Sequence, residues 1–237
     1  MGVATTYAEA LYQADPDRSS LTEVTAAIDR SLAILETLPD DQRAPGVYRQ
    51  ASSYYFEHAD VLRQRGAVAD AAAAYRRTAD LLRGYLRLLG ENPSVAVERA
   101  DGQRMLSAAL LQLNDLAGAV DTARLALERE PFNVSNYRAA AAALIQAQRL
   151  DEAAVTLTVG VMVTGNPELR GASLDLYRGG LDTEGCAVST GAGAPVLNPE
   201  CPVVRRHICA AAVEAIRIQQ AAGRGTLADV IQQSVVA

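Results

Sequence analysis

The stretch that decides the fold of this chain is Gln103–Pro131, QRMLSAALLQLNDLAGAVDTARLALEREP. Two small residues, Ala119 and Ala126, stand seven residues apart in its second half, and Pro131 follows five residues later. An alanine at each position allows a neighbouring helix to approach closely. The proline then ends the helix, because its ring cannot continue the hydrogen-bond ladder. The stretch therefore predicts two closely packed helices followed by a turn.

Small residues return at comparable positions on both sides of this stretch. Downstream, Ala141 and Ala153 take the small positions, Gly160 replaces the second alanine, and Asn166-Pro167 ends the unit. Upstream, the aromatic, small, apolar and turn positions are filled in order by Tyr55, Ala59, Leu62, Gly66, Ala71 and Tyr75. This pattern resembles the tetratricopeptide repeat, a helix–turn–helix module of about 34 residues. It gives three repeats over 52–165 and a degenerate one before them, around Ala27 and Pro39.

The resemblance implies an all-α, right-handed α-solenoid of tetratricopeptide type with a divergent C-terminal helical cap. The apolar spacing and the turn residues predict helices, and no alternating stretch favours a strand. These helices are expected at 5–14, 21–38, 46–64, 67–89, 94–113, 116–129, 134–147, 150–163, 167–178, 199–222 and 226–236. We divide the chain into a repeat array over 1–178, a glycine-rich loop over 179–198 and capping helices over 199–237. Asn198 is expected to cap the helix that starts at Pro199.

Composition and charge exclude several classes of function. The 237 residues carry a formal net charge of −6, so nonspecific binding of nucleic acid is not expected. All 22 basic residues are arginine, which rules out Schiff-base and lysine-base chemistry. No apolar run reaches the ~18 residues of a membrane span, and the first twenty residues do not read as a signal peptide. We expect no cofactor, because no phosphate-binding glycine loop is present.

Three cysteines, Cys186, Cys201 and Cys209, lie within 24 residues, with His207 among them. A zinc site would need four ligands, typically in two close pairs, and a catalytic cysteine would need a histidine facing it. Neither spacing is present, which leaves buried thiols or one disulfide. Cys201 and Cys209 would be too far apart on one helix to bond, so Cys186 is the shared partner candidate. A bonded pair would favour an exported or cell-surface protein, and free thiols a cytoplasmic one.

The resemblance also indicates where a ligand would bind. In the family, four positions of each first helix line an inner groove that holds a peptide. The residues at these positions that we select as groove candidates are Phe56, Asp60, Arg63, Arg104, Leu111, Arg138 and Ile145. Arg63, Arg104 and Arg138 would form a row able to hold carboxylates. The lysine and asparagine of the family's carboxylate clamp are absent.

We therefore expect a non-enzymatic scaffold whose groove binds a peptide or protein segment. An alternative is a self-assembling subunit that forms rings or filaments by end-to-end stacking, because an uncovered solenoid end exposes its stacking surface. Apolar residues along the last long helix and the tail motivate this alternative: Val203, Val204, Ile208, Val213, Ile216, Ile218, Val230, Ile231, Val235 and Val236. A third reading is a recruiting module of a larger protein.

Overall fold

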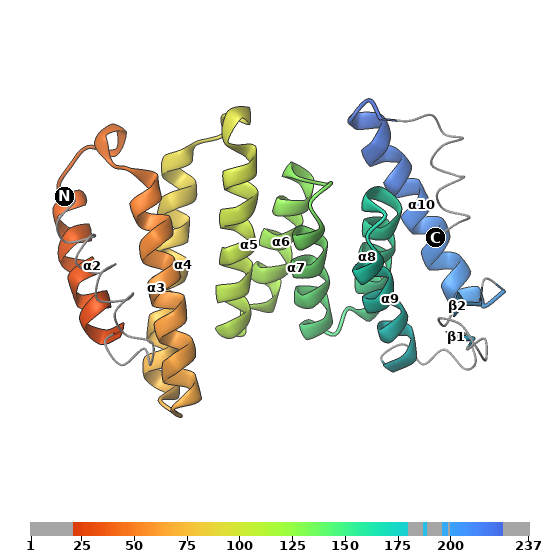
Figure 1. The fold of residues 1–237 in the computed structure, drawn as a ribbon, viewed down its shortest axis with the longest axis horizontal. Coiled ribbons are helices and arrows are strands. Elements are labelled where there is room, and N and C mark those ends of the chain that lie inside the picture. The colour runs from red at the N-terminus through yellow and green to blue at the C-terminus, as the bar shows by residue number, and fades with distance from the viewer. Residues whose placement is uncertain (1–20, 180–186, 189–195, 199, 225–237) are drawn as a thin grey trace. The chain divides into compact units, whose positions relative to one another are not determined.

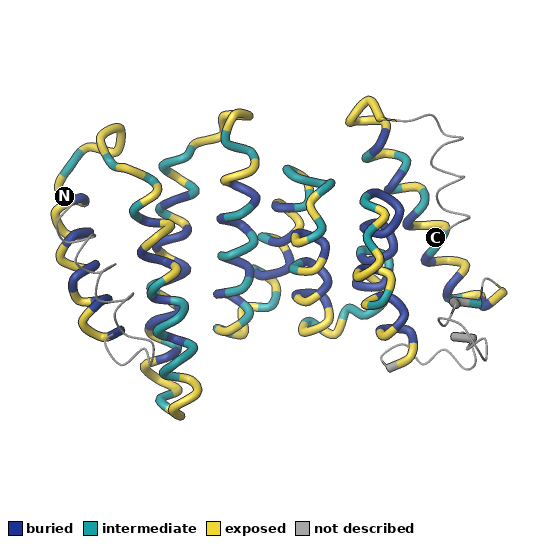
Figure 2. Tube along the Cα trace, viewed as in Figure 1, coloured by how far each residue is buried: buried dark blue, intermediate teal, exposed yellow. Residues whose placement is uncertain are grey.

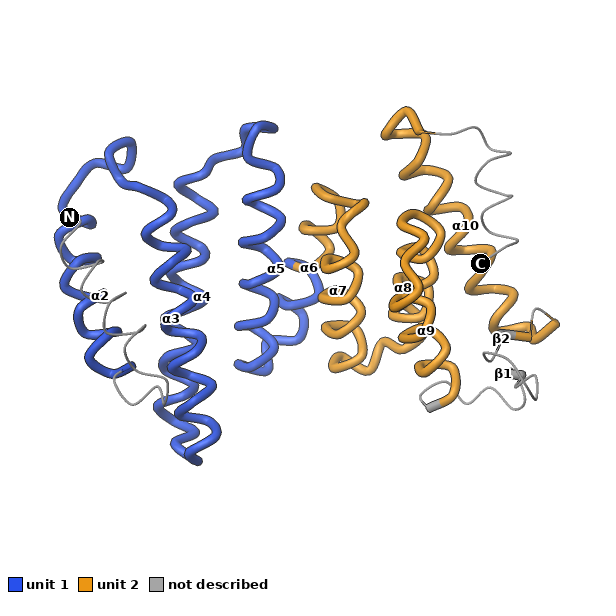
Figure 3. The backbone as a smooth tube through the Cα atoms, viewed as in Figure 1, with its two compact units in different colours: residues 1–122 blue, residues 123–237 orange. Residues whose placement is uncertain are grey.

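A computed structural model describes residues 21–179, 187–188, 196–198 and 200–224. Over these ranges the chain is all-α except for one two-residue strand pairing. It divides into two compact units, residues 1–122 and 123–237, and the boundary lies within one helix (Figure 3). This division differs from the one expected from the sequence, in which the repeat array ends at residue 178 and the glycine-rich loop at residue 198. None of the described helices is long and apolar enough to cross a membrane.

Unit 1 is built from successive helices that pack side by side (Figure 1). In chain order these are α2 (Leu21–Leu35), the 3-10 turn η1 (Asp40–Gln42), α3 (Pro45–Gln64), α4 (Val68–Leu89), η2 (Pro93–Val95), α5 (Ala96–Gln112) and the start of α6 (Leu116–Arg129). Buried positions line the facing sides of these helices (Figure 2). Their core is unusually rich in tyrosine for a chain with few aromatic residues: Tyr48, Tyr55, Tyr75 and Tyr85 are all buried in it.

A buried arginine holds the end of α4. The side chain of Arg99 is 8% exposed, and it donates hydrogen bonds to the carbonyl of Leu86, at 2.7 Å, and to that of Gly90. It also forms an ion pair with Glu91 at 2.6 Å. The last carbonyls of a helix lack partners within the helix, so a guanidinium placed there satisfies them and complements the negative end of the helix dipole.

Unit 2 contains the rest of α6, followed by α7 (Val134–Gln146), α8 (Leu150–Thr164), α9 (Pro167–Gly179) and α10 (Pro202–Ala221). Helix α8 is central, because α7, α9 and α10 all pack against it. Close approach to α8 depends on Gly160. A Cβ atom there would lie 2.7 Å from Leu169 Cδ1 and 2.8 Å from Tyr137 Cγ. The glycine thus replaces the expected alanine because even a methyl group would not fit.

The small residues of the sequence pattern are buried, as close helix packing requires: Ala59, Ala71, Ala119, Ala126, Ala141 and Ala153. Hydrogen bonds from the preceding or following helix reach the backbone at two of them. Ser107 Oγ donates to the carbonyl of Ala119 at 2.8 Å, and Asn136 Nδ2 donates to that of Ala126 at 3.0 Å. The helices therefore approach closely enough for a side chain of one to bond the backbone of the next.

One turn recurs between paired helices in both units. Gly66, Asn114 and Gln148 adopt positive φ angles of 79°, 59° and 58° after α3, α5 and α7. In each case the amide of the following residue donates to a carbonyl five residues back, at 2.8–2.9 Å. This is the Schellman arrangement that ends helices. Asn114 and Gln148 are thirty-four residues apart, which matches the period of the tetratricopeptide repeat.

The C-terminal part differs from expectation in two places. Helix α10 begins at Pro202 with Cys201 at its N-cap, so the predicted start at Pro199 was wrong. Asn198 instead accepts a hydrogen bond from the amide of Glu200, at 3.0 Å, in a turn before the helix. The expected loop also holds a short antiparallel pairing of β1 (Ala187–Val188) with β2 (Val196–Leu197). Two residues are too few to show alternation. The helices predicted at 5–14 and 226–236 lie outside the described residues.

Candidate functional site

The groove residues predicted on α3 are engaged with one another and with α4. Phe56 packs edge-on against Tyr75, with ring centroids 5.4 Å apart. Asp60 accepts a hydrogen bond from the Tyr75 hydroxyl and forms an ion pair with Arg63 at 3.2 Å. Burial, followed by the hydrogen bond to Asp60, raises the pKa of Tyr75 to about 12. Asp60 and Arg63 are thus parts of a local polar cluster.

Arg104 on α5 is also occupied. It forms an ion pair with Asp101, whose carboxylate further accepts two hydrogen bonds from Arg49 of α3, at 2.6 and 3.0 Å. Leu111, one residue before the end of α5, is half-buried. The Asp101 carboxylate therefore joins α3 and α5, and the guanidinium of Arg104 already has a carboxylate partner.

Unit 2 carries the remaining predicted groove residues. Arg138 on α7 pairs with Glu168 of α9 at 3.3 Å, and both side chains are well exposed. Ile145, near the end of α7, is one of the exposed large apolar residues. Each of the three predicted arginines thus has a carboxylate partner within this chain. A ligand carboxylate would have to displace that partner, and exposed pairs of this kind are worth only about 0–1 kcal/mol.

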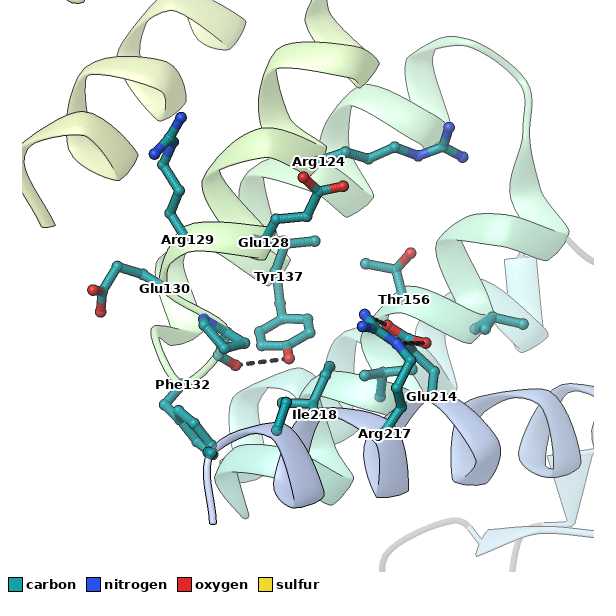
Figure 4. Close-up of a pocket in the computed structure, with 16 residues that line it drawn as sticks. Arg124, Glu128, Arg129, Glu130, Phe132, Tyr137, Thr156, Glu214, Arg217 and Ile218 are labelled. Atoms are coloured by element: carbon teal, nitrogen blue, oxygen red, sulfur yellow. Dashed lines mark hydrogen bonds and ion pairs between the residues drawn. The ribbon is translucent and has the colours of Figure 1, made fainter. Parts of the chain in front are cut away.

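The structure has a cavity at a different place in unit 2, with a volume of about 640 Å³ (Figure 4). It lies between the end of α6, the α6–α7 loop, α7, α8 and α10. None of the predicted groove residues lines it. The lining residues are Arg124, Leu127, Glu128, Arg129, Glu130, Pro131, Phe132, Tyr137, Val155, Thr156, Val159, Glu214, Arg217, Ile218, Ala221 and Ala222.

Apolar side chains form the floor of the cavity. Tyr137 is 1% exposed, and its hydroxyl donates to the carbonyl of Pro131 at 2.7 Å, which fixes the α6–α7 loop against α7. Burial raises the pKa of this hydroxyl well above its usual value, so it stays protonated. Val155 and Val159 come from α8 and Ile218 from α10. The floor can therefore take apolar groups but offers little polar chemistry.

Charged side chains surround this floor, and the arginines among them are engaged. Arg124 of α6 pairs with Glu152 of α8 at 2.6 Å. Arg217 of α10 donates to both oxygens of Glu214, at 2.6 and 2.8 Å. Arg129 also has an interaction partner. The rim thus consists largely of ion pairs formed within the chain.

An aromatic ring closes one end of the cavity. The guanidinium carbon of Arg224, just beyond α10, lies 4.1 Å from the centroid of the Phe132 ring. At this distance the cation interacts favourably with the face of the ring. The α6–α7 loop that carries Phe132 is held by Asn136, whose side chain donates to the carbonyls of Ala126 and Glu130 at 3.0 and 3.1 Å. Phe132 therefore projects from an anchored loop.

Sequence reasoning missed this cavity. Its walls come from α6 and α10, which are separated by about 70 residues and by the glycine-rich segment. The family pattern also directs attention to the first helix of each repeat, whereas most of the lining comes from second helices and α10. A partial signal was present in Glu130-Pro131-Phe132, because an aromatic residue directly after a helix-ending proline is exposed unless another element covers it.

His207, which lies among the cysteines in the sequence, is buried and joins three helices. His207 of α10 is 3% exposed, with Nδ1 2.8 Å from the hydroxyl of Tyr177 on α9 and Nε2 3.0 Å from Asp151 Oδ1 on α8. These three residues do not line the cavity. Cys209, two residues further on, is an exposed free thiol. The two side chains therefore do not face each other.

The structure tests part of the prediction that the cysteines are either buried thiols or joined in one disulfide. Cys201 is disulfide-bonded. Cys186 lies outside the described residues, so its pairing stays a prediction. Among the residues that the structure describes, no group of three or more histidine, cysteine, aspartate or glutamate side chains is placed to hold a metal ion.

Comparisons with known proteins do not assign the chain to a family. No protein-family model matches the sequence, and a search of curated proteins finds no significant match.

Proposed function

We propose that this protein is a non-enzymatic helical-repeat scaffold of tetratricopeptide type that binds a segment of a partner protein in the unit 2 cavity. The observation that carries the proposal is the cavity itself: an apolar floor of Tyr137, Val155, Val159 and Ile218, surrounded by charged side chains. Its volume of about 640 Å³ is within the range of known ligand sites.

Two features support the repeat assignment. The left-handed turn residues Asn114 and Gln148 are thirty-four residues apart, which is the period of the family. The alanines that the family pattern requires at helix–helix contacts are buried. Repeat proteins of this kind generally offer stacked helices as a binding surface, and an apolar groove between helices suits an amphipathic segment.

The chemistry of the cavity favours binding over catalysis. A reaction centre needs a nucleophile or base that can reach the substrate, usually with a perturbed pKa. Among the residues that the structure describes, no histidine or cysteine lines the cavity, and Tyr137 is protonated and hydrogen-bonded. His207 and its partner Tyr177 are buried outside the cavity.

Self-assembly has less support from α10 than the sequence suggested. Val204 is fully buried and so is not available to a second copy, whereas Ile218 faces the cavity. Val213 is 70% exposed and is the largest remaining apolar contribution of the described part of this helix. The apolar tail residues lie outside the described residues, and self-assembly through them stays a prediction.

Binding can be measured without background, because the protein has no tryptophan. Short amphipathic peptides containing one tryptophan and two leucines would be titrated with protein while tryptophan fluorescence is followed. The Ala221→Tyr variant fills the cavity from α10, and Ala210→Tyr places the same side chain at an exposed position of α10 outside the lining. We expect Ala221→Tyr to weaken binding at least about tenfold, equivalent to 1.4 kcal/mol, and Ala210→Tyr to leave it unchanged.

The comparison of the two variants decides the proposal. If none of the peptides binds the unmodified protein, or if both variants bind as well as it does, the cavity is not a peptide site. Circular dichroism of both variants shows whether either has lost its helical fold.

A further inference from the structure

Some of the charged side chains around the cavity have a partner of opposite charge within the chain, and others do not. Arg124 and Arg217 pair with Glu152 and Glu214, and Arg129 has a partner as well. A ligand that approaches the floor therefore meets two arginines, Arg124 and Arg217, whose charge is already neutralised. For the same reason, none of the described arginines that line the cavity is free to bind a ligand carboxylate.

Glu128, in contrast to these arginines, has no ion-pair partner among the described residues. It lies on the last turns of α6, its side chain is exposed at the cavity, and it has no hydrogen bond or ion pair with any described residue. The pKa of Arg217 is raised mainly by its hydrogen bond with Glu214, and Glu128 adds to this effect. Glu128 is therefore within electrostatic reach of α10. In Figure 4 it stands above the floor, whereas Glu130 points away from it.

A cation already lies against Phe132, one of the residues that line the cavity. The Arg224 guanidinium is placed over the Phe132 ring, and Arg224 follows the end of α10 by three residues. This contact is an internal example of what the cavity can bind: a positively charged group against an aromatic face, next to an apolar floor.

From these two independent observations we infer that the partner segment is basic: an apolar side chain fills the floor, and an adjacent arginine or lysine reaches Glu128. This inference rests on the proposed function and specifies the chemistry of its partner. It is opposite in sign to the acidic ligand that the arginine row predicted. The formal net charge of −6 adds a weak long-range attraction for such a segment.

The test uses three tryptophan-containing peptides of equal length with the same two leucines. The first is flanked by arginines, the second by glutamates and the third by serines. Each is titrated with the full-length protein, with Glu128→Gln, and with the matched variant Asp121→Asn. Asp121 is exposed on the same helix, two turns before Glu128, and does not line the cavity. The comparison thus separates a local contact from a change in net charge.

We expect the arginine peptide to bind most tightly and the glutamate peptide least. Glu128→Gln should weaken the arginine peptide roughly two- to five-fold, the range for an exposed ion pair, and leave the serine peptide unchanged. Asp121→Asn should have a smaller effect. Added salt should reduce the difference between the peptides, because these charges are exposed.

The outcomes separate this inference from the proposed function. Equal binding of all three peptides, tighter binding of the glutamate peptide, or equal effects of the two variants would overturn the basic-segment inference while the cavity remains a peptide site. If no peptide binds, the proposed function fails and the inference fails with it.

Discussion

The hydroxyl oxygen of Tyr177 lies 2.8 Å from Nδ1 of His207, so a single imidazole joins α9 to α10. Its other ring nitrogen lies 3.0 Å from Asp151 on α8, which makes His207 a bridge among three helices. The arrangement fits a neutral ring that accepts a hydrogen bond from the tyrosine and donates one to the carboxylate. Burial lowers the pKa of His207, Asp151 opposes this effect, and Arg206 reinforces it.

The protein should therefore lose stability as the pH falls below neutral. An unfolded histidine titrates near a pKa of about 6.5, and the folded pKa of His207 is lower. The folded state thus binds fewer protons between the two values, and its stability drops as the pH falls through this window. Urea unfolding at about pH 7.5 and about pH 5.5 should show a lower midpoint at the acid pH.

Two variants assign this effect to a residue. His58 is half-buried, and its pKa is also lowered, chiefly by burial and then by Arg65. His207→Gln should reduce the pH dependence and also lower stability at neutral pH, because it disturbs the bridge. His58→Gln should reduce the pH dependence alone. An unchanged midpoint difference in His207→Gln would show that the imidazole does not carry the effect.

Gly160 should be intolerant of even a methyl group. Gly160→Ala would place Cβ 2.8 Å from the ring of Tyr137, which cannot move without opening the cavity floor. We expect a loss of about 1–3 kcal/mol in the free energy of unfolding. Gly171→Ala is the matched control, because Gly171 lies within α9 with nothing within 4 Å of its added Cβ. It should stabilise the protein by roughly 0.5–1 kcal/mol through helix propensity. Chemical denaturation of both variants gives the comparison, and equal effects would contradict it.

At Gln148, in the left-handed turn after α7, the backbone conformation determines how a substitution affects stability. Its φ of 58° is unfavourable for residues other than glycine and asparagine. Gln148→Gly should raise the free energy of unfolding by about 1 kcal/mol. Gln146→Gly, two residues earlier at the end of α7, should lower it by roughly 0.5–1 kcal/mol. The same sign for both variants would mean that the turn is not strained.

The helices could be predicted because their signals are local. Small residues such as Ala119 and Ala126 mark close contacts, and Gly66 and Pro131 mark ends, so the expected bounds of α3, α6 and α8 differ from the structure by at most one residue. The all-α class follows from the same signals. The start of α10 was misplaced because Asn198 and Pro199 form a plausible cap, while the chain turns once more and begins the helix at Pro202.

The candidate site could not be predicted, because its parts meet only through tertiary packing. Nothing near Phe132 in the sequence indicates that Arg224 will cover its ring. Likewise, the pair that neutralises Arg138 depends on Glu168 of another helix, whose placement follows from helix packing. The partner of Arg104 is local by contrast, because Asp101 precedes it by three residues on α5, a spacing visible in the sequence. A row of like charges in a sequence therefore does not establish a free charged surface.

Arg224 provides the last prediction, because it covers the Phe132 ring, against which a further arginine of a basic peptide can pack. Arg224→Gln removes a cation–π contact worth about 0.5–1 kcal/mol at an exposed site, and should tighten binding of the arginine-flanked peptide by roughly two- to five-fold. The substitution also makes the net charge of the protein more negative, and this change alone would favour binding of a basic peptide. Arg205→Gln removes the same charge from an exposed position of α10 outside the cavity lining. Titration of both variants should therefore show the larger gain for Arg224→Gln. Equal gains would mean that net charge, rather than competition for the Phe132 ring, governs the affinity.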